Sequence, residues 1–180
     1  MKPYFKYLYN CLRQKLWKIR HQNLRFEEIS LLGFDTRFVC SADSQVSFGK
    51  RVLSDGRFSV IVEHGRLSVG SYTYFNEGCM ISAKKEIQIG EGCQFGPHVV
   101  IIDNNHSFTA STGVQASHTA KPIRIGEHCW IAANAVILGG AEIGAGCVIG
   151  AGCVIKESIP PHSIVTMERR LQIHAIEDRG

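Results

Sequence analysis

Isoleucine recurs at a constant interval of six residues in the second half of the chain. An α-helix turns by about 600° over six residues, so this period would scatter the isoleucines around its circumference. A strand followed by a turn restores the same orientation each time, as in hexapeptide β-helices. The period therefore predicts an all-β fold of stacked parallel strands around one core. Its members are Ile125, Ile131, Ile137, Ile143, Ile149 and Ile155.

Small residues fill two further positions of the repeat. Glycine often follows the isoleucine, which we attribute to tight corners with positive φ. The fifth position is small and often cysteine, so we expect those cysteines to be packing residues. No spacing forms a CxxC pair and the count of seven is odd, so we expect reduced thiols. The positions concerned are Gly126, Gly144 and Gly150, and then Cys79, Cys93, Cys129, Ala135, Ala141, Cys147 and Cys153.

The repeat is interrupted twice upstream. Two extra residues at Lys84-Lys85 shift the frame to Ile89, and no hexapeptide pattern is present from Asp103 to Pro122. The distance from Ile89 to Ile125 is still a whole number of six-residue units. We therefore expect a long loop over 103–122 that leaves the solenoid, and such loops on rigid repeats commonly carry function.

The first 26 residues have a different pattern, with apolar side chains at helical spacing, many cations and no acid. This predicts a basic amphipathic helix over 1–26, followed by a β-helix domain over 27–165 and a tail over 166–180. We expect the apolar stripe to pack on the body of the protein or on a neighbouring subunit. The alternative is adsorption to an anionic membrane surface, favoured by Tyr4, Tyr7, Tyr9 and Trp17 among the cations. The stripe contains Phe5, Leu8, Leu12, Leu16 and Ile19, and the cations are Lys2, Lys6, Arg13, Lys15, Lys18, Arg20 and Arg25.

Composition adds little to this picture. A chain of 180 residues with 44% hydrophobic and 20% charged residues is typical of one ordinary globular domain. The net charge of +4 suits phosphate-bearing or acidic ligands but does not require nucleic acid, and none is expected. No apolar run of about 18 residues and no secretory signal is present, so we expect a cytoplasmic protein.

Three segments carry a family resemblance: Ile101–His106 at the start of the interruption, Pro122–Ile131, and Gly150–Pro161. With them, residues 46–165 resemble the hexapeptide-repeat acyltransferases, in the branch of maltose, galactoside, xenobiotic and surface-polysaccharide O-acetyltransferases. The resemblance implies a left-handed parallel β-helix that assembles as a homotrimer. It also implies acetyl transfer from acetyl-CoA to a saccharide hydroxyl at clefts between subunits, with no metal. Capsule or O-antigen synthesis at the inner face of a bacterial cytoplasmic membrane is the expected setting.

The same resemblance makes His106 the catalytic base. Acetyl transfer to a hydroxyl needs a group that removes the proton as the oxygen attacks the thioester, and imidazole titrates near neutral pH. Asp103 or a backbone carbonyl is expected to hold the His106 ring in the useful tautomer. Asn105 is expected to bind the acceptor.

The cofactor residues are also carried over from the resemblance. Ala133 and Ala151 are expected to let the pantetheine arm approach the backbone, and Trp130 to flank the thiol. Lys156 is expected near the phosphates of CoA, supplemented by Arg169 or Arg170. The alternatives are ordinary corner residues for the two alanines and subunit packing for Trp130.

Three other functions compete with this one. An N-acetyltransferase acting on an amino or nucleotide sugar would use the same base, whereas a non-catalytic scaffold would not need His106. A γ-type carbonic anhydrase needs three histidines that hold zinc at a subunit interface, and His98, His118 and His128 do not reproduce its paired-histidine segment.

Overall fold

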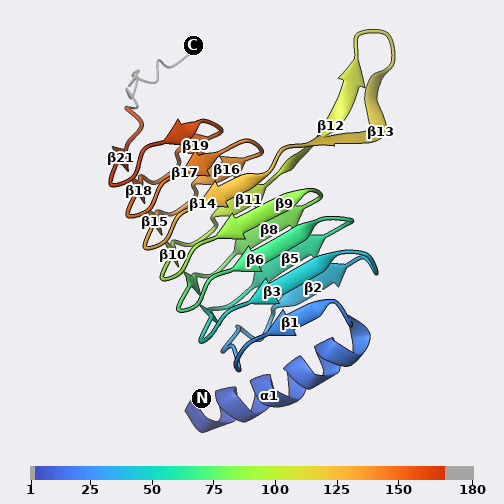
Figure 1. Ribbon diagram of the computed structural model, residues 1–180, viewed down its shortest axis with the longest axis vertical. Coiled ribbons are helices and arrows are strands. Elements are labelled where there is room, and N and C mark those ends of the chain that lie inside the picture. The colour runs from blue at the N-terminus through green and yellow to red at the C-terminus, as the bar shows by residue number, and fades with distance from the viewer. Residues whose placement is uncertain (1–2, 169–180) are drawn as a thin grey trace, which may run out of the picture.

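The computed structural model describes residues 3–168, which form a parallel β-solenoid with one helix across its N-terminal end (Figure 1). Each coil passes through three sheets in turn, and each strand pairs in parallel with its counterparts in the coils before and after it. Ile125, for example, pairs with Ile89 on one side and Ile143 on the other. The predicted stack of parallel strands is confirmed.

The three sheets form the three sides of the solenoid. Sheet 1 has seven strands: β1 (Leu24–Phe26), β3 (Gln45–Phe48), β6 (Arg66–Val69), β9 (Glu86–Ile89), β14 (Ile123–Ile125), β17 (Glu142–Ile143) and β20 (Ser158–Ile159). Sheet 2 has six: β4 (Leu53–Ser54), β7 (Tyr74–Phe75), β10 (Gln94–Phe95), β15 (Trp130–Ile131), β18 (Val148–Ile149) and β21 (Ile164–Val165). Sheet 3 also has six: β2 (Arg37–Cys40), β5 (Phe58–Val62), β8 (Cys79–Ala83), β11 (Val100–Ile102), β16 (Val136–Leu138) and β19 (Val154–Ile155).

The core is one continuous column inside these sheets. The six isoleucines of the repeat are all buried, and phenylalanines replace them toward the N-terminus. Phe75 stacks between Phe58 and Phe95, with ring centroids 4.6 and 4.7 Å away. The cysteines at the fifth position are free thiols and are buried, which confirms them as packing residues.

The glycines that follow the isoleucines have a different cause from the one expected. Gly126 does not adopt positive φ; a Cβ there would lie 2.5 Å from the backbone nitrogen of Ala145 in the next coil. Consecutive coils touch at this corner, so only a residue without a side chain fits. Positive φ occurs two residues later, where His128 has φ 55°.

The helix α1 (Pro3–Arg20) ends earlier than residue 26, because β1 begins the first coil at Leu24. It packs on the solenoid, but the expectation that its apolar stripe makes this contact is wrong. Asn10 and Gln14 are buried against the first coil, whereas Leu12 is 59% exposed. The first coil presents an open sheet edge, whose backbone groups need hydrogen-bond partners rather than apolar cover. No helix within residues 3–168 is long and apolar enough to cross a bilayer.

Candidate active site

The predicted loop over 103–122 is a two-stranded antiparallel hairpin, β12 (Asn104–Thr109) and β13 (Gly113–Ala120). The chain leaves the solenoid after β11, at the corner between sheets 3 and 1, and returns to it at β14. Figure 1 shows the hairpin projecting away from the coils. Most of its residues are exposed and none is fully buried.

His106 and His118 are cross-strand partners on this hairpin. Their ring centroids lie 4.2 Å apart with the planes tilted by 43°, and both residues are exposed. Nδ1 of His106 lies 3.4 Å from the carbonyl oxygen of Gln115, a long contact for a hydrogen bond. His118 was not predicted as a site residue. The interruption has His106 near its start and His118 near its end, and this placement was a signal that the two could pair across a hairpin.

Charged groups surround His118. Lys84 forms an ion pair with Glu63, with Nζ 2.5 Å from Oε2, and this pair holds the pKa of Glu63 below its ordinary value. The pKa of His118 is lowered, first by loss of solvation and then by the positive charges of Lys84 and His106. His118 therefore stays neutral to a lower pH than a free histidine, and a neutral imidazole accepts a proton.

Asp103 has a structural place at the foot of the hairpin. Its buried carboxylate accepts hydrogen bonds from the backbone amides of Lys84, Lys85 and Glu86 at 2.8, 2.7 and 2.9 Å. The first two of these amides belong to the insertion of Lys84-Lys85 that shifts the hexapeptide frame, and the third begins β9. The Asp103 carbonyl also accepts from the amide of Lys121, at 2.9 Å, which ties the two stems together. The carboxylate thus contacts the solenoid, not the ring of His106.

Asn105, which is expected to bind the acceptor, lies on the hairpin. Asn105 is exposed and pairs with Thr119 across the two strands, next to the pair of His106 and His118. The structure thus brings Asn105 and His106 onto one protruding element.

The residues expected to bind the cofactor lie at two different corners. Ala133 and Ala151 are stacked at the corner between sheets 2 and 3, where the amide of Gly152 donates to the carbonyl of Ala133 at 2.9 Å. Trp130 is 55% exposed on the adjoining strand β15. Lys156 is exposed at the corner between sheets 3 and 1, the corner that also carries the hairpin.

One chain therefore does not bring all of these residues together. Sheet 3 separates the corner of Ala133 and Ala151 from the hairpin that carries His106. Arg169 and Arg170, the remaining expected cofactor residues, lie outside the described residues.

The histidines weighed for a zinc site are dispersed. His98 and His128 occupy corner positions with φ of 57° and 55°, whereas His118 is on the hairpin. Among residues 3–168 no group of three histidine, cysteine, aspartate or glutamate side chains is placed to hold a metal ion. The dispersal gives the carbonic anhydrase alternative no geometric support.

Comparison with known proteins agrees with the repeat. Residues 122–157 match the family model of the bacterial transferase hexapeptide (six repeats). Nodulation protein L of Rhizobium meliloti (strain 1021) is 38% identical over 95 residues, covering 53% of this chain and 52% of the relative. The chain thus spans about half the length of that curated relative. The galactoside O-acetyltransferase of Lactococcus lactis subsp. lactis (strain IL1403) is 26% identical over 159 residues, covering 84% of this chain and 75% of the relative.

Solved structures share the fold. An N-acyltransferase from Bacillus cereus in complex with dTDP and 3-hydroxybutyryl-CoA superposes with a TM-score of 0.70 at 17% identity, over 84% of this chain and 81% of that one. A hexapeptide-repeat containing acetyltransferase from Vibrio cholerae, complexed with acetyl coenzyme A, gives 0.58 at 21% identity, over 86% and 70%. This chain is thus similar to hexapeptide-repeat transferases in the repeat of residues 122–157 and in the parallel solenoid to which that repeat belongs.

Proposed function

We propose that this protein is an O-acetyltransferase that moves an acetyl group from acetyl-CoA to a hydroxyl of a saccharide. The observation that carries the proposal is the exposed pair of His106 and His118 on the hairpin that leaves the solenoid just before the matched transferase repeat. The relative named a galactoside O-acetyltransferase, which aligns over 84% of this chain, supports a hydroxyl acceptor.

His106 is the base in this proposal. It takes the proton of the acceptor hydroxyl as the oxygen attacks the thioester carbonyl, a carbon–oxygen bond forms, and the carbon–sulfur bond then breaks. The protonated ring returns the proton to the departing sulfur. His118, whose lowered pKa keeps it neutral, is a close partner for the ring of His106 without adding a second charge.

The donor fits the corner between sheets 2 and 3. Gly96, Ala133 and Ala151 follow one another there in successive coils, so no bulky side chain separates a pantetheine arm from the backbone. Trp130 offers an exposed aromatic surface beside this corner. Lys156 is an exposed cation suited to the phosphates of CoA.

A homotrimer would complete the site. The outer face of sheet 3 carries an apolar ladder, in which Val100 pairs with Met80 and Val136, and Ile102 pairs with Leu138. The outer face of sheet 1 is polar in the same coils, since Gln88 pairs with Arg124 and Arg124 with Glu142. The apolar outer face of sheet 3 favours burial against another copy. With sheet 3 at the interface, the His106 hairpin of one subunit approaches the alanine corner of its neighbour.

The setting remains the one expected from the sequence. We propose a cytoplasmic enzyme of bacterial surface-polysaccharide synthesis, working at the inner face of the cytoplasmic membrane on a lipid-linked glycan of a capsule or an O-antigen. The relatives that aligned carry names of saccharide chemistry or nodulation, in agreement with a glycan acceptor.

The test is acetyl-CoA consumption with a panel of saccharides, amino sugars and nucleotide sugars. His106→Ala is expected to lower turnover about 10²- to 10⁴-fold, because general base catalysis is lost. His64→Ala is the matched control, since His64 is an exposed histidine that pairs with Asp43 on a corner two coils away from the hairpin. Unchanged turnover in the His106 variant would sink the assignment of the base. A preference for an amine over every hydroxyl would change the reaction to N-acetylation.

A further inference from the structure

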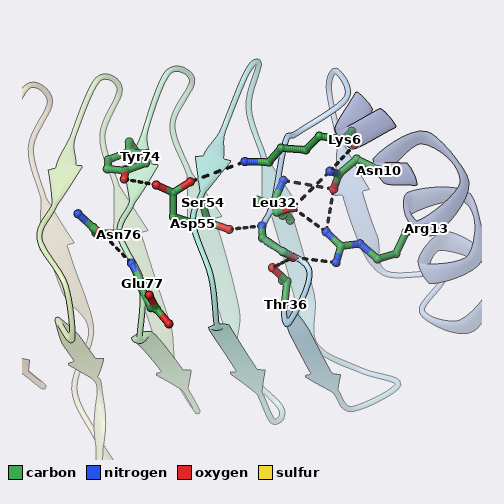
Figure 2. Close-up of polar contacts among 11 residues, drawn as sticks. Lys6, Asn10, Arg13, Leu32, Thr36, Ser54, Asp55, Tyr74, Asn76 and Glu77 are labelled. Carbon is green, nitrogen blue, oxygen red and sulfur yellow. Dashed lines mark hydrogen bonds and ion pairs between the residues drawn. The ribbon is translucent and has the colours of Figure 1, made fainter. Parts of the chain in front are cut away.

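The helix α1 is held to the solenoid by polar side chains (Figure 2). The side-chain amide of Asn10 donates to the carbonyl of Leu32 at 3.3 Å, and its oxygen accepts from the Leu32 amide at 3.2 Å. Gln14 pairs in the same way with the backbone of Ser30, at 2.6 and 3.3 Å. Arg13 donates to the carbonyls of the segment 32–34 at 2.8–2.9 Å. These contacts fix the orientation of the helix.

With its polar side turned inward, the apolar stripe faces away from the molecule. At about 100° per residue, Leu8, Leu12 and Leu16 lie on the side of the helix opposite Asn10 and Gln14. All members of the stripe are exposed: Phe5 58%, Leu8 49%, Leu12 59%, Leu16 65% and Ile19 77%. A continuous exposed apolar strip of this length marks a surface that something else covers.

Charge distinguishes between the candidates that could cover it. Within residues 3–20 the helix has no acidic side chain, and the exposed cations Lys15, Lys18 and Arg20 border the stripe. Glu27 and Glu28 lie across a groove from Lys15 and Lys18, toward the first coil, and form no ion pair with them. Two such helices placed stripe to stripe would bring their cations together without acids between them. An anionic partner is therefore favoured over a second copy.

The position of the helix suits a flat partner. It lies across the N-terminal end of the solenoid, with the hairpin and the last coils at the other end (Figure 1). We propose that the outer stripe of α1 docks on the surface of an anionic lipid bilayer, apolar side chains in the acyl boundary and cations at the headgroups. The solenoid then stands on end. The hairpin leaves it three to four strands beyond β1, about 14–19 Å along the axis.

This orientation deepens the function proposed above, because it gives a lipid-linked glycan a fixed height at which to be acetylated. The docking itself does not depend on the reaction. The two proposals can therefore be tested separately, by measuring both lipid binding and acetylation of a soluble acceptor in the same variants.

Flotation of the full-length protein with vesicles tests the docking. Vesicles of phosphatidylcholine with phosphatidylglycerol are expected to carry the protein, and phosphatidylcholine alone to carry much less. Leu12→Ser with Leu16→Ser is expected to lower binding at least about tenfold, because two of the inserted side chains are lost. Ile164→Ser, at an apolar residue 75% exposed on the far end of the solenoid, is the matched control and should bind as the wild type does.

A second pair of substitutions, Lys15→Gln with Lys18→Gln, tests the role of charge and should weaken binding to the anionic vesicles. Lys121→Gln with Arg124→Gln, on exposed cations beyond the hairpin and far from the helix, should not. Wild-type protein that stays unbound with both vesicle types, or a leucine variant that binds as well as the wild type, would overturn the proposal. Light scattering without vesicles covers the remaining case: a smaller oligomer in the leucine variant would show that the stripe contacts a second copy instead.

Discussion

The coils of the solenoid and the helix α1 both alternate apolar with polar positions, yet they turn opposite sides toward the molecule. Ile125 in a coil is buried, and Arg124 beside it on β14 faces outward. On α1 the buried residues are Asn10 and Gln14, and Leu12 is 59% exposed. The difference shows that an amphipathic pattern identifies an element without saying which side of it packs.

What each element covers explains the difference. The interior of a coil meets other side chains, so apolar groups fill it. The helix meets the open edge of the first coil, where unpaired backbone groups would be costly. The amides of Asn10 and Gln14 each donate to and accept from the same backbone residue, as the backbone of a neighbouring strand would. Two side chains thus replace part of an edge strand and cap the repeat.

The largest expected effect is on the coil side of this comparison. Ile137→Ala should lower the free energy of unfolding by about 2–5 kcal/mol, because it leaves a cavity in a closed column. Leu12→Ala on the outer side of α1 should change it by less than about 0.5 kcal/mol. Chemical denaturation of both variants measures the difference. Equal losses would mean that the stripe of α1 is as well packed as the core.

The reactivity of the thiols also distinguishes the buried coils from the helix α1. Burial raises the pKa of Cys79 to about 11 from its ordinary value of 9.0, so its thiolate is about 100-fold scarcer near pH 8. Reaction with a disulfide reagent should therefore label Cys11 of the helix first, and Cys79 only on unfolding. Mass spectrometry of the labelled peptides reports the order. Fast labelling of Cys79 in the folded protein would contradict its place in the core.

A substitution that makes the inner side of α1 more apolar should destabilise the protein. Asn10→Leu removes both hydrogen bonds to the backbone of Leu32 and should cost about 1–3 kcal/mol, since those groups stay buried. Leu12→Asn, which moves an amide to the exposed side, is the paired control and should be close to neutral. Thermal unfolding of the two variants decides the matter, and a stabilised Asn10 variant would refute the account of the cap.

The sequence was sufficient to predict the solenoid because its signal is local and repeated. Each isoleucine, with the small residue at the fifth position, reports the same environment in every coil, and the buried cysteines follow from that rule. The inward side of α1 was not predictable from its pattern. It depends on the backbone edge of residues 30–32, which no property of the helix itself records.

The site was predictable in part, for a related reason. The interruption at 103–122 located the hairpin, and the family resemblance selected His106. The pairing of His118 with His106 was established by the register of the two strands, which joins residues twelve positions apart in sequence. The role of Asp103 at the insertion of Lys84-Lys85 likewise depends on a contact between coils that has no sequence signature.

The central claim is that His106 of one subunit works at the alanine corner of another. Mixed assemblies of His106→Ala and Ala151→Trp subunits test it most directly, because each variant alone should be inactive as an acetyltransferase. Random mixing in equal amounts should restore about a quarter of wild-type turnover, from sites that combine an intact hairpin with an intact corner. No recovery in mixed trimers verified by native mass spectrometry would contradict a site shared between subunits.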